Sequence, residues 1–375
     1  MVVKEANNAK KILVTGASGF IGTRLIEKLT AAAGYTVTAL VRNSGKAHQL
    51  RAAGVDTIVA DLADRTKIDT AVQGHHSVIN LAHDFKRSQK HNLRCFSHLS
   101  QACTRHGVQH LVQVSSIVVY DGWPWRNISE ESRSGKPGTE YKNTKVAIEN
   151  ALLDSSEKGL LHSTIIQPTI VYGPSSWMWT DHIVEKLMSG TVVLPADQES
   201  TCNAVYVDDV ADALVLAVSR DGRSAEKYII SGSAVPSWQE FFESFNQFLG
   251  TDSIRYMDVV ALAPGHLGTA GKLKSILANP LQLADRKPVR QVLNGMQRVM
   301  GERAVEGLKT FLQGLKKSTG PVVYYPGHHE LELYCAKGKC SIEKAQKELG
   351  YMPKLDFQAG FELTAKYLED KTQGL

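Results

Sequence analysis

The chain has 375 residues, a net charge of +5 and 22% charged residues, and its hydrophobic fraction of 43% is ordinary for a soluble globular protein. No stretch approaches the roughly 18 apolar residues of a membrane span, and the first residues lack the apolar segment of a secretory signal. The five cysteines are odd in number and scattered, which excludes a disulfide framework and predicts a cytoplasmic protein.

The first half of the sequence alternates short β-rich segments with helical periodicity, which predicts a parallel sheet covered by helices on both faces. We expect a Rossmann-like, doubly wound α/β domain in residues 1–172, to which 206–232 returns. A smaller, mostly helical C-terminal substrate domain is expected in 173–205 and 233–375. The expected strands are 11–15, 35–41, 57–60, 77–81, 111–115, 164–167 and 227–231. The expected helices include 21–29, 65–72, 92–106, 141–155, 341–349 and 357–368, with others beginning at 207 and 237.

A glycine-rich turn joins the first expected strand to the first expected helix. Gly16 permits a sharp turn, and Gly19 leaves space for a diphosphate that a side chain would obstruct. The following helix presents free N–H groups and its positive dipole end to phosphates, while Gly22 lets the helix pack closely on the strand. The turn therefore predicts a dinucleotide site formed by Gly16, Ser18, Gly19, Phe20, Ile21 and Gly22.

The end of the second strand indicates which dinucleotide is bound. An acidic residue there would accept hydrogen bonds from a ribose 2'-hydroxyl, but this chain has Arg42, followed by Lys46. A guanidinium group favours a 2'-phosphate. We therefore expect NADP(H) to be preferred, with NAD(H) as the alternative; a solvated surface arginine is the other interpretation of Arg42.

Tyr141 and Lys145 lie four residues apart in an expected helix, so their side chains point the same way. A nearby ammonium stabilises phenolate and lowers a pKa that starts at about 10, which makes the tyrosine usable as an acid or base around neutrality. An earlier strand ends in Ser115 and Ser116, whose hydroxyls reach the same edge of the sheet. The pattern predicts proton transfer by Tyr141 beside a nicotinamide.

Together these motifs resemble the extended short-chain dehydrogenase/reductase family, the branch with nucleotide-sugar epimerases, dihydroflavonol-type reductases and 3β-hydroxysteroid dehydrogenases. The resemblance covers roughly residues 10–232. It implies that Tyr141 is the proton donor or acceptor and that Lys145 lowers its pKa and holds the nicotinamide ribose. It also implies that Ser116 hydrogen-bonds the substrate oxygen, with Ser115 as the competitor. The further cofactor contacts that it implies are Asp61, Leu62, Leu81, Ala82, His83, Ser115, Tyr141, Lys145, Pro168, Ile170 and Val171.

Two departures from the family's pattern distinguish between its branches. Dehydratases place an Asp-Glu pair after the serine, where this chain has Ile117 and Val118, so acid-catalysed dehydration is not expected. Nucleotide-sugar members carry an arginine five residues before Val207, where this chain has Cys202, and it therefore lacks that clamp on the sugar diphosphate. We expect NADP(H)-dependent hydride transfer to or from a secondary alcohol or ketone of a small cyclic substrate, with a nucleotide-sugar epimerase as the alternative.

Four of the five tryptophans follow the turns that are expected to face the substrate. Trp123 and Trp125 come after the serine-containing strand, and Trp177 and Trp179 come after a Tyr-Gly-Pro turn. Their side chains offer broad apolar walls with a hydrogen-bonding edge, so we expect them to bind the substrate. Packing in the protein interior is the other interpretation.

An insertion at about 252–330 is expected to be helical and basic. Within it, residues 272–317 hold ten lysines and arginines against three acids. The segment is interpreted as a lid, as a contact with an anionic membrane surface or acidic carrier protein, or as a solvated cap. No nucleic-acid reading module and no standard metal-binding spacing is recognised. A homodimer through the helices near Asn92 and Tyr141 is a family expectation.

Overall fold

The computed structural model describes residues 9–196, 199–220, 225–262 and 322–373, and the chain divides into two compact units. Unit 1 comprises the residues up to Thr180 together with Asn203–Val235 and Lys337–Leu375. Unit 2 comprises Asp181–Cys202 and Pro236–Ala336. Segment 206–232 lies in unit 1 with the N-terminal fold. The C-terminal segment Lys337–Leu375 also lies there, although the sequence grouped it with the substrate-binding region.

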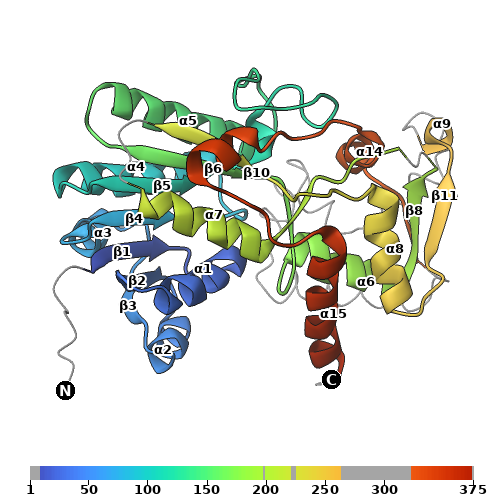
Figure 1. Ribbon diagram of the computed structural model, residues 1–375, viewed down its shortest axis with the longest axis horizontal. Helices are drawn as coiled ribbons and strands as arrows, with labels where there is room; N and C mark the ends of the chain where they lie inside the picture. Colours follow the sequence, from blue (N-terminus) through green and yellow to red (C-terminus); the bar gives the residue numbers. More distant parts are fainter. Residues whose placement is uncertain (1–8, 197–198, 221–224, 263–321, 374–375) are drawn as a thin grey trace, which may run out of the picture. The chain divides into compact units, whose positions relative to one another are not determined.

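A seven-stranded sheet forms the centre of unit 1, in the order β10-β6-β5-β4-β1-β2-β3 (Figure 1). Every neighbouring pair is parallel, and the ends of each strand lie within one residue of the expected ones. The predicted doubly wound fold is therefore confirmed. The strands are β1 (Lys10–Thr15), β2 (Tyr35–Val41), β3 (Asp56–Val59), β4 (Ser77–Asn80), β5 (His110–Val114), β6 (Ser163–Pro168) and β10 (Glu226–Ile230).

Helices cover both faces of this sheet because the strand side chains alternate between them. Ile12 of β1 packs in one buried cluster with Leu25 and Leu214, whereas its neighbour Leu13 packs on the opposite face with Leu99. The helices of the first face are α1 (Phe20–Ala31), α2 (Ser44–Ala52) and α7 (Val207–Ser219). Those of the second face are α3 (Arg65–Val72), α4 (Gln89–Arg105) and α5 (Glu140–Glu157).

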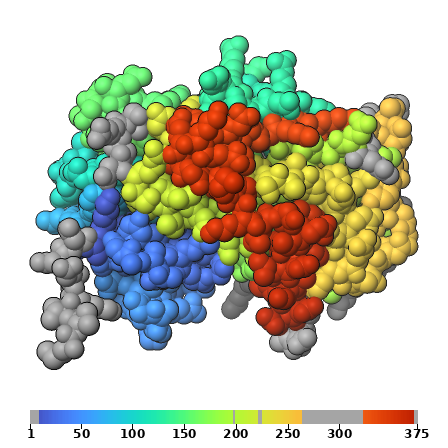
Figure 2. All heavy atoms as spheres, in the orientation of Figure 1, coloured from blue at the N-terminus to red at the C-terminus, as the bar shows by residue number. Residues whose placement is uncertain are grey.

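The C-terminal segment packs on unit 1 through a short helical turn, η3 (Ala345–Leu349). Gly350 ends that turn with φ of 70°, a conformation that favours glycine. Tyr351 then donates a hydrogen bond of 2.9 Å to the Ser231 carbonyl, and in Figure 2 the red atoms of this segment lie over the yellow-green atoms of α7. Unit 1 also contains the short helix η1 (Ile117–Val119), strand β7 (Ile170–Tyr172), its parallel partner β9 (Ala204–Tyr206), and α15 (Phe357–Gln373).

Unit 2 contains a parallel three-stranded sheet that the sequence did not predict, with β11 (Ile254–Met257) and β12 (Val322–Tyr324) on either side of β8 (Gly190–Pro195). Strands this short leave little periodic signal. The helix expected to begin at 237 is present, and Ser237 and Glu240 form a capping box at its start. The helices described in this unit are α6 (His182–Ser189), α8 (Trp238–Phe248), α9 (Val259–Leu262) and α14 (His328–Cys335).

The basic segment 272–317 lies outside the described residues. Among the helices that the structure describes, none combines the length and the apolarity needed to cross a bilayer. The five cysteines all carry free thiols. Within the described ranges, no group of three or more His, Cys, Asp or Glu side chains is arranged to hold a metal ion.

Candidate active site

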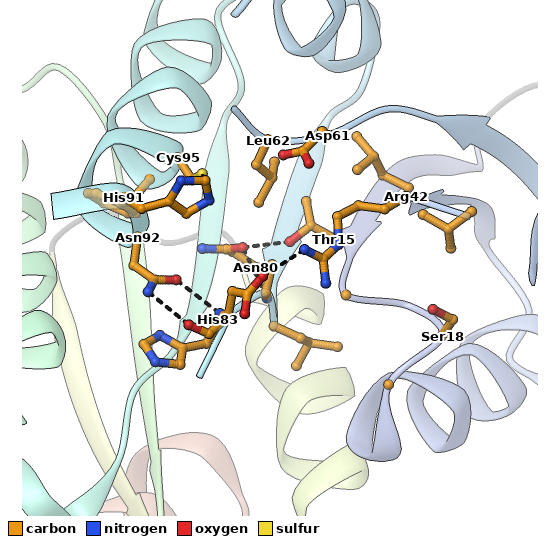
Figure 3. A pocket seen from close by; sticks show the side chains of 18 of the residues that line it. Thr15, Ser18, Arg42, Asp61, Leu62, Asn80, His83, His91, Asn92 and Cys95 are labelled. Carbon is orange, nitrogen blue, oxygen red and sulfur yellow. Dashed lines mark hydrogen bonds and ion pairs between the residues drawn. The ribbon is translucent and has the colours of Figure 1, made fainter. Parts of the chain in front are cut away.

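A cavity of about 250 Å³ lies at the carboxyl ends of β1, β2 and β4 (Figure 3). The strand order reverses between β1 and β4, and such a reversal opens a crevice where doubly wound sheets bind ligands. The predicted cofactor residues that line it are Gly16, Ser18, Gly19, Arg42, Asp61, Leu62, Leu81, Ala82 and His83. The other lining residues are Thr15, Leu40, Val41, Asn80, Asp84, His91, Asn92, Cys95, Phe96 and Ile148.

The glycine turn at this cavity leaves no space for side chains. Gly16 has φ of 69°, and a Cβ atom there would lie 3.0 Å from the Ala82 amide nitrogen. A Cβ atom at Gly22 would lie 2.3 Å from the Gly16 carbonyl oxygen. The N-cap of α1 is Gly19, which has no side chain to accept hydrogen bonds from the first amides of the helix. This bare helix end at a cavity fits a dinucleotide diphosphate.

Arg42 and Asp84 meet at the rim of the cavity. The guanidinium Nη1 of Arg42 donates to Oδ2 of Asp84 at 2.8 Å. Burial opposes ionisation of Asp84, but hydrogen bonds from Arg42 and from the Lys86 amide outweigh it and hold the pKa of this carboxyl below its usual value. Asp61 accepts from the Ala63 amide at 2.8 Å. The cavity therefore carries both a fixed cation and fixed carboxylates.

Tyr141 and Lys145 project from the same face of α5, as their spacing predicted. The Lys145 side chain is 3% exposed, and its ammonium donates to the Val114 carbonyl at 2.8 Å and lies 5.6 Å from the Tyr141 ring centroid. Burial lowers the pKa of Lys145 to about 8, although the charge of Glu149 acts to raise it. At neutral pH the ammonium is therefore still mostly protonated.

The predicted lowering of the Tyr141 pKa is absent in this structure. Burial raises the pKa of the phenol, and a hydrogen bond with the Ser116 side chain lowers it only in part. The reason is geometric, because the Lys145 ammonium hydrogen-bonds a backbone carbonyl and not the phenol. Ser116 also accepts from the Val118 amide at 3.4 Å, so its hydroxyl caps the short helical turn that follows β5 as well as acting on the Tyr141 pKa.

The neighbouring Ser115 belongs to a buried polar network instead. Its hydroxyl donates to Oε1 of Glu149, which also accepts from Gln167 Nε2 at 2.9 Å. Tyr120 in turn donates to Gln167 Oε1 at 2.8 Å. Of the two candidate serines, Ser116 is the one whose side chain acts on the Tyr141 pKa, whereas Ser115 is engaged with Glu149. Glu149 was not predicted, although its place four residues after Lys145 puts it on the same helical face.

An aromatic cluster connects the cavity to Tyr141. The His83 ring lies edge-on to the Tyr141 ring with centroids 5.0 Å apart, and the Phe85 ring lies 5.3 Å from the same ring. Burial, and then the charge of Lys145, lower the pKa of His83 to about 4, so its imidazole is neutral at pH 7. Phe85 was not predicted, yet it is 72% exposed beside the reactive phenol.

The remaining predicted residues do not line the described cavity. Trp123 packs partly buried against Ile117, Val119 and Tyr120, which matches the core interpretation for that side chain. Trp125 and Trp177 are exposed, and Trp179 is half-buried. Their contacts with a substrate stay predictions, as do the cofactor contacts of Phe20, Ile21, Gly22, Ser115, Pro168, Ile170 and Val171.

The glycine turn, the cavity at the strand reversal and the Tyr141/Lys145 pair all belong to unit 1, and residues 12–231 match the NAD dependent epimerase/dehydratase family. The chain belongs to this family. It is therefore an enzyme of the extended short-chain dehydrogenase/reductase type, and the resemblance found in the sequence is confirmed.

Named relatives in the family are dehydrogenases and reductases. The human sterol-4-alpha-carboxylate 3-dehydrogenase, decarboxylating, is 27% identical over 248 residues, which is 62% of this chain and 65% of that protein, slightly under two thirds of its length. The 2-alkyl-3-oxoalkanoate reductase of Stenotrophomonas maltophilia is 24% identical over 93% of this chain and 97% of the relative. The UDP-glucose 4-epimerase of Thermotoga maritima has the same fold, with a TM-score of 0.67, 18% identity and coverage of 96% of this chain and 99% of that one.

Proposed function

We propose that this family member is an NADP(H)-dependent oxidoreductase that transfers hydride between nicotinamide and a secondary alcohol or ketone of a small cyclic substrate. The observation that carries the proposal is the grouping of Ser116 and Lys145 around the Tyr141 phenol. The His83 ring packs against the Tyr141 ring and also lines the cavity at the glycine turn. Membership of an NAD-dependent family supports the cofactor class. The choice of NADP(H) over NAD(H) rests on Arg42 at the end of β2.

Each side chain has a defined task in this proposal. The bound nicotinamide supplies or accepts the hydride. Tyr141 donates a proton to the substrate carbonyl oxygen as the hydride arrives at carbon, and Ser116 hydrogen-bonds the phenol and the same oxygen. The Lys145 charge stabilises the phenolate that remains. Because burial raises the pKa of Tyr141, the phenol is protonated at neutral pH and can act as the proton donor in this step.

An apolar substrate suits the surroundings of Tyr141. The exposed ring of Phe85 provides an apolar surface 5.3 Å from the Tyr141 ring. The names of two relatives refer to a sterol and an alkyl-oxoalkanoate, both of which carry oxygen functions on apolar skeletons. Ile117 stands where dehydratases carry an acid, and Cys202 stands where nucleotide-sugar members carry an arginine; both are buried and uncharged. Ile117 therefore argues against a dehydratase, and Cys202 supports a reductase over an epimerase.

The test is NADPH consumption, followed at 340 nm, with a 3-ketosteroid and a 2-alkyl-3-oxoalkanoate as probe ketones. We expect oxidation of NADPH with at least one probe and a loss of about 10²- to 10⁴-fold in Tyr141→Phe, with cofactor binding retained. Tyr367→Phe is the matched control, because Tyr367 and Lys371 have the same spacing on α15. Undiminished turnover by Tyr141→Phe would refute the assignment, and epimerisation of UDP-glucose without net NADPH consumption would favour the epimerase.

We keep a cytoplasmic location in this proposal, supported by the five free thiols. A homodimer through α4 and α5 also remains a proposal, and sedimentation of the purified chain tests it. The roles of 272–317 as a lid, a membrane contact or a carrier contact stay proposals, and co-sedimentation with anionic liposomes, with and without that segment, tests the membrane role. Binding that does not depend on the segment would contradict the membrane role.

A further inference from the structure

The ion pair between Arg42 and Asp84 joins the ends of two strands at the rim of the cavity. Arg42 follows β2 and Asp84 lies four residues after Asn80, the last residue of β4, and both residues line the same cavity (Figure 3). Their side chains are 63% and 20% exposed, so the carboxylate is the more enclosed partner. The residue expected to recognise a 2'-phosphate is thus already engaged by a carboxylate.

Asp84 is held in place by contacts other than the arginine. Its backbone amide donates to Asn92 Oδ1 at 2.9 Å, and Asn92 Nδ2 donates back to the Asp84 carbonyl at 3.0 Å. Its Oδ1 accepts from the Lys86 amide at 2.9 Å, which leaves Oδ2 for Arg42. Asn92 is 8% exposed on α4. The loop therefore presents the carboxylate to the rim in a fixed position, and the more exposed Arg42 reaches toward it.

This geometry has opposite consequences for the two dinucleotides. A 2'-phosphate adds a charge of about −2 at neutral pH, and it needs the Arg42 guanidinium that Asp84 holds. Its charge would also come close to the Asp84 carboxylate, and like charges repel. A 2'-hydroxyl carries no charge and is a donor, for which a carboxylate at the rim is a suitable acceptor. Strand β2 ends without an acidic residue to accept from the 2'-hydroxyl. Asp84, on the loop after β4, supplies that acceptor instead.

We propose that Asp84 sets the balance between the two dinucleotides, weakening NADPH binding by competing for Arg42 while keeping NADH acceptable. This inference rests on the proposed function, because it assumes a dinucleotide in the cavity. It adds Asp84, on the loop after β4, as a second residue for cofactor specificity beside Arg42 at the end of β2. The enzyme then accepts both cofactors, with a preference for NADPH that is smaller than Arg42 alone would produce.

Fluorescence titration of the full chain with NADPH and NADH tests the inference without any substrate. Asp84→Asn keeps an oxygen for the Lys86 amide but removes the charge. We expect its Kd for NADPH to fall about fivefold, the size of one exposed ion pair, and its Kd for NADH to stay equal or rise. The gain should shrink in 0.5 M salt, because added ions screen exposed charges. In the Arg42→Ala background, Asp84→Asn should improve NADPH affinity less than it does in the wild type, because the competition for Arg42 is gone and only the repulsion is relieved.

Asp154→Asn is the matched control, because it removes an exposed carboxylate that is paired with Lys158 on α5. It should leave both affinities unchanged. Asp84→Ser, which also retains a hydroxyl acceptor, serves as a second variant if Asp84→Asn does not fold. An unchanged ratio of NADPH to NADH affinity in Asp84→Asn overturns the inference while leaving the proposed function intact. Failure of the wild type to bind either dinucleotide overturns both.

Discussion

Replacement of the buried Lys145 by methionine should stabilise the protein while removing its activity. The lysine is 3% exposed and its pKa is about 8, compared with an ordinary value of 10.5. One pKa unit corresponds to 1.36 kcal/mol, so keeping this ammonium charged in the folded state costs about 3 kcal/mol below pH 8. That value already includes the favourable charge of Glu149, which is second to burial among the causes.

The substitution also removes a hydrogen bond. The Val114 carbonyl loses the ammonium but still accepts from Gln113 Nε2 at 2.7 Å, so the loss is about 1 kcal/mol. The burial cost of about 3 kcal/mol exceeds the lost hydrogen bond of about 1 kcal/mol, so Lys145→Met should be more stable than the wild type by about 2 kcal/mol at pH 7. Its activity should be lost, because no charge then supports the Tyr141 phenolate.

The pH dependence gives the sign of the effect. Between about pH 8 and 10.5 the unfolded wild type binds more protons at this residue than the folded state does, so wild-type stability rises with pH in that window. The advantage of Lys145→Met should be complete below pH 8 and disappear towards pH 10.5. Urea unfolding at several pH values, without cofactor, measures it, and Lys158→Met on the exposed end of α5 is the control. A variant less stable than the wild type at pH 7, or an advantage independent of pH, would refute the reasoning.

Three further outcomes are expected. Glu149→Gln removes the charge that raises the Lys145 pKa. The pH above which NADPH oxidation declines should therefore move below about 8, with activity recovered near pH 6. An unshifted pH–rate profile would contradict this role of Glu149. Phe85→Ala should raise KM for an apolar ketone about tenfold with little change in kcat, because uniform binding is lost; an unchanged KM would place the substrate elsewhere. Gly22→Ala would place a Cβ 2.3 Å from the Gly16 carbonyl oxygen. It should therefore abolish dinucleotide binding in fluorescence titration and lower the midpoint of urea unfolding. Normal dinucleotide binding would contradict the close packing of Gly22 on the glycine turn.

The long elements of the Rossmann-like unit could be predicted because their patterns are local. Short β-rich runs marked the seven strands of the large sheet, and apolar residues at helical spacing marked α1 and α4. The short strands of unit 2 could not be found this way, because β12 has only three residues and pairs with a strand far away in the sequence. Likewise, no local pattern indicates that Tyr351 and its neighbours pack on the first unit.

In the candidate site, the spacing of residues along one helix determined that Tyr141 and Lys145 share a face, and the glycine turn determined where phosphates can approach. Only the tertiary structure decided which groups those side chains meet. Burial lowers the Lys145 pKa, and the Lys145 ammonium hydrogen-bonds a backbone carbonyl and not the phenol. Ser116 and not Ser115 acts on the Tyr141 pKa, because the Ser115 hydroxyl donates to Glu149. Asp84 meets Arg42 because β2 and β4 end at the same edge of the sheet. Desolvation and contacts between distant strands depend on the whole fold, so neighbouring residues in the sequence cannot specify them.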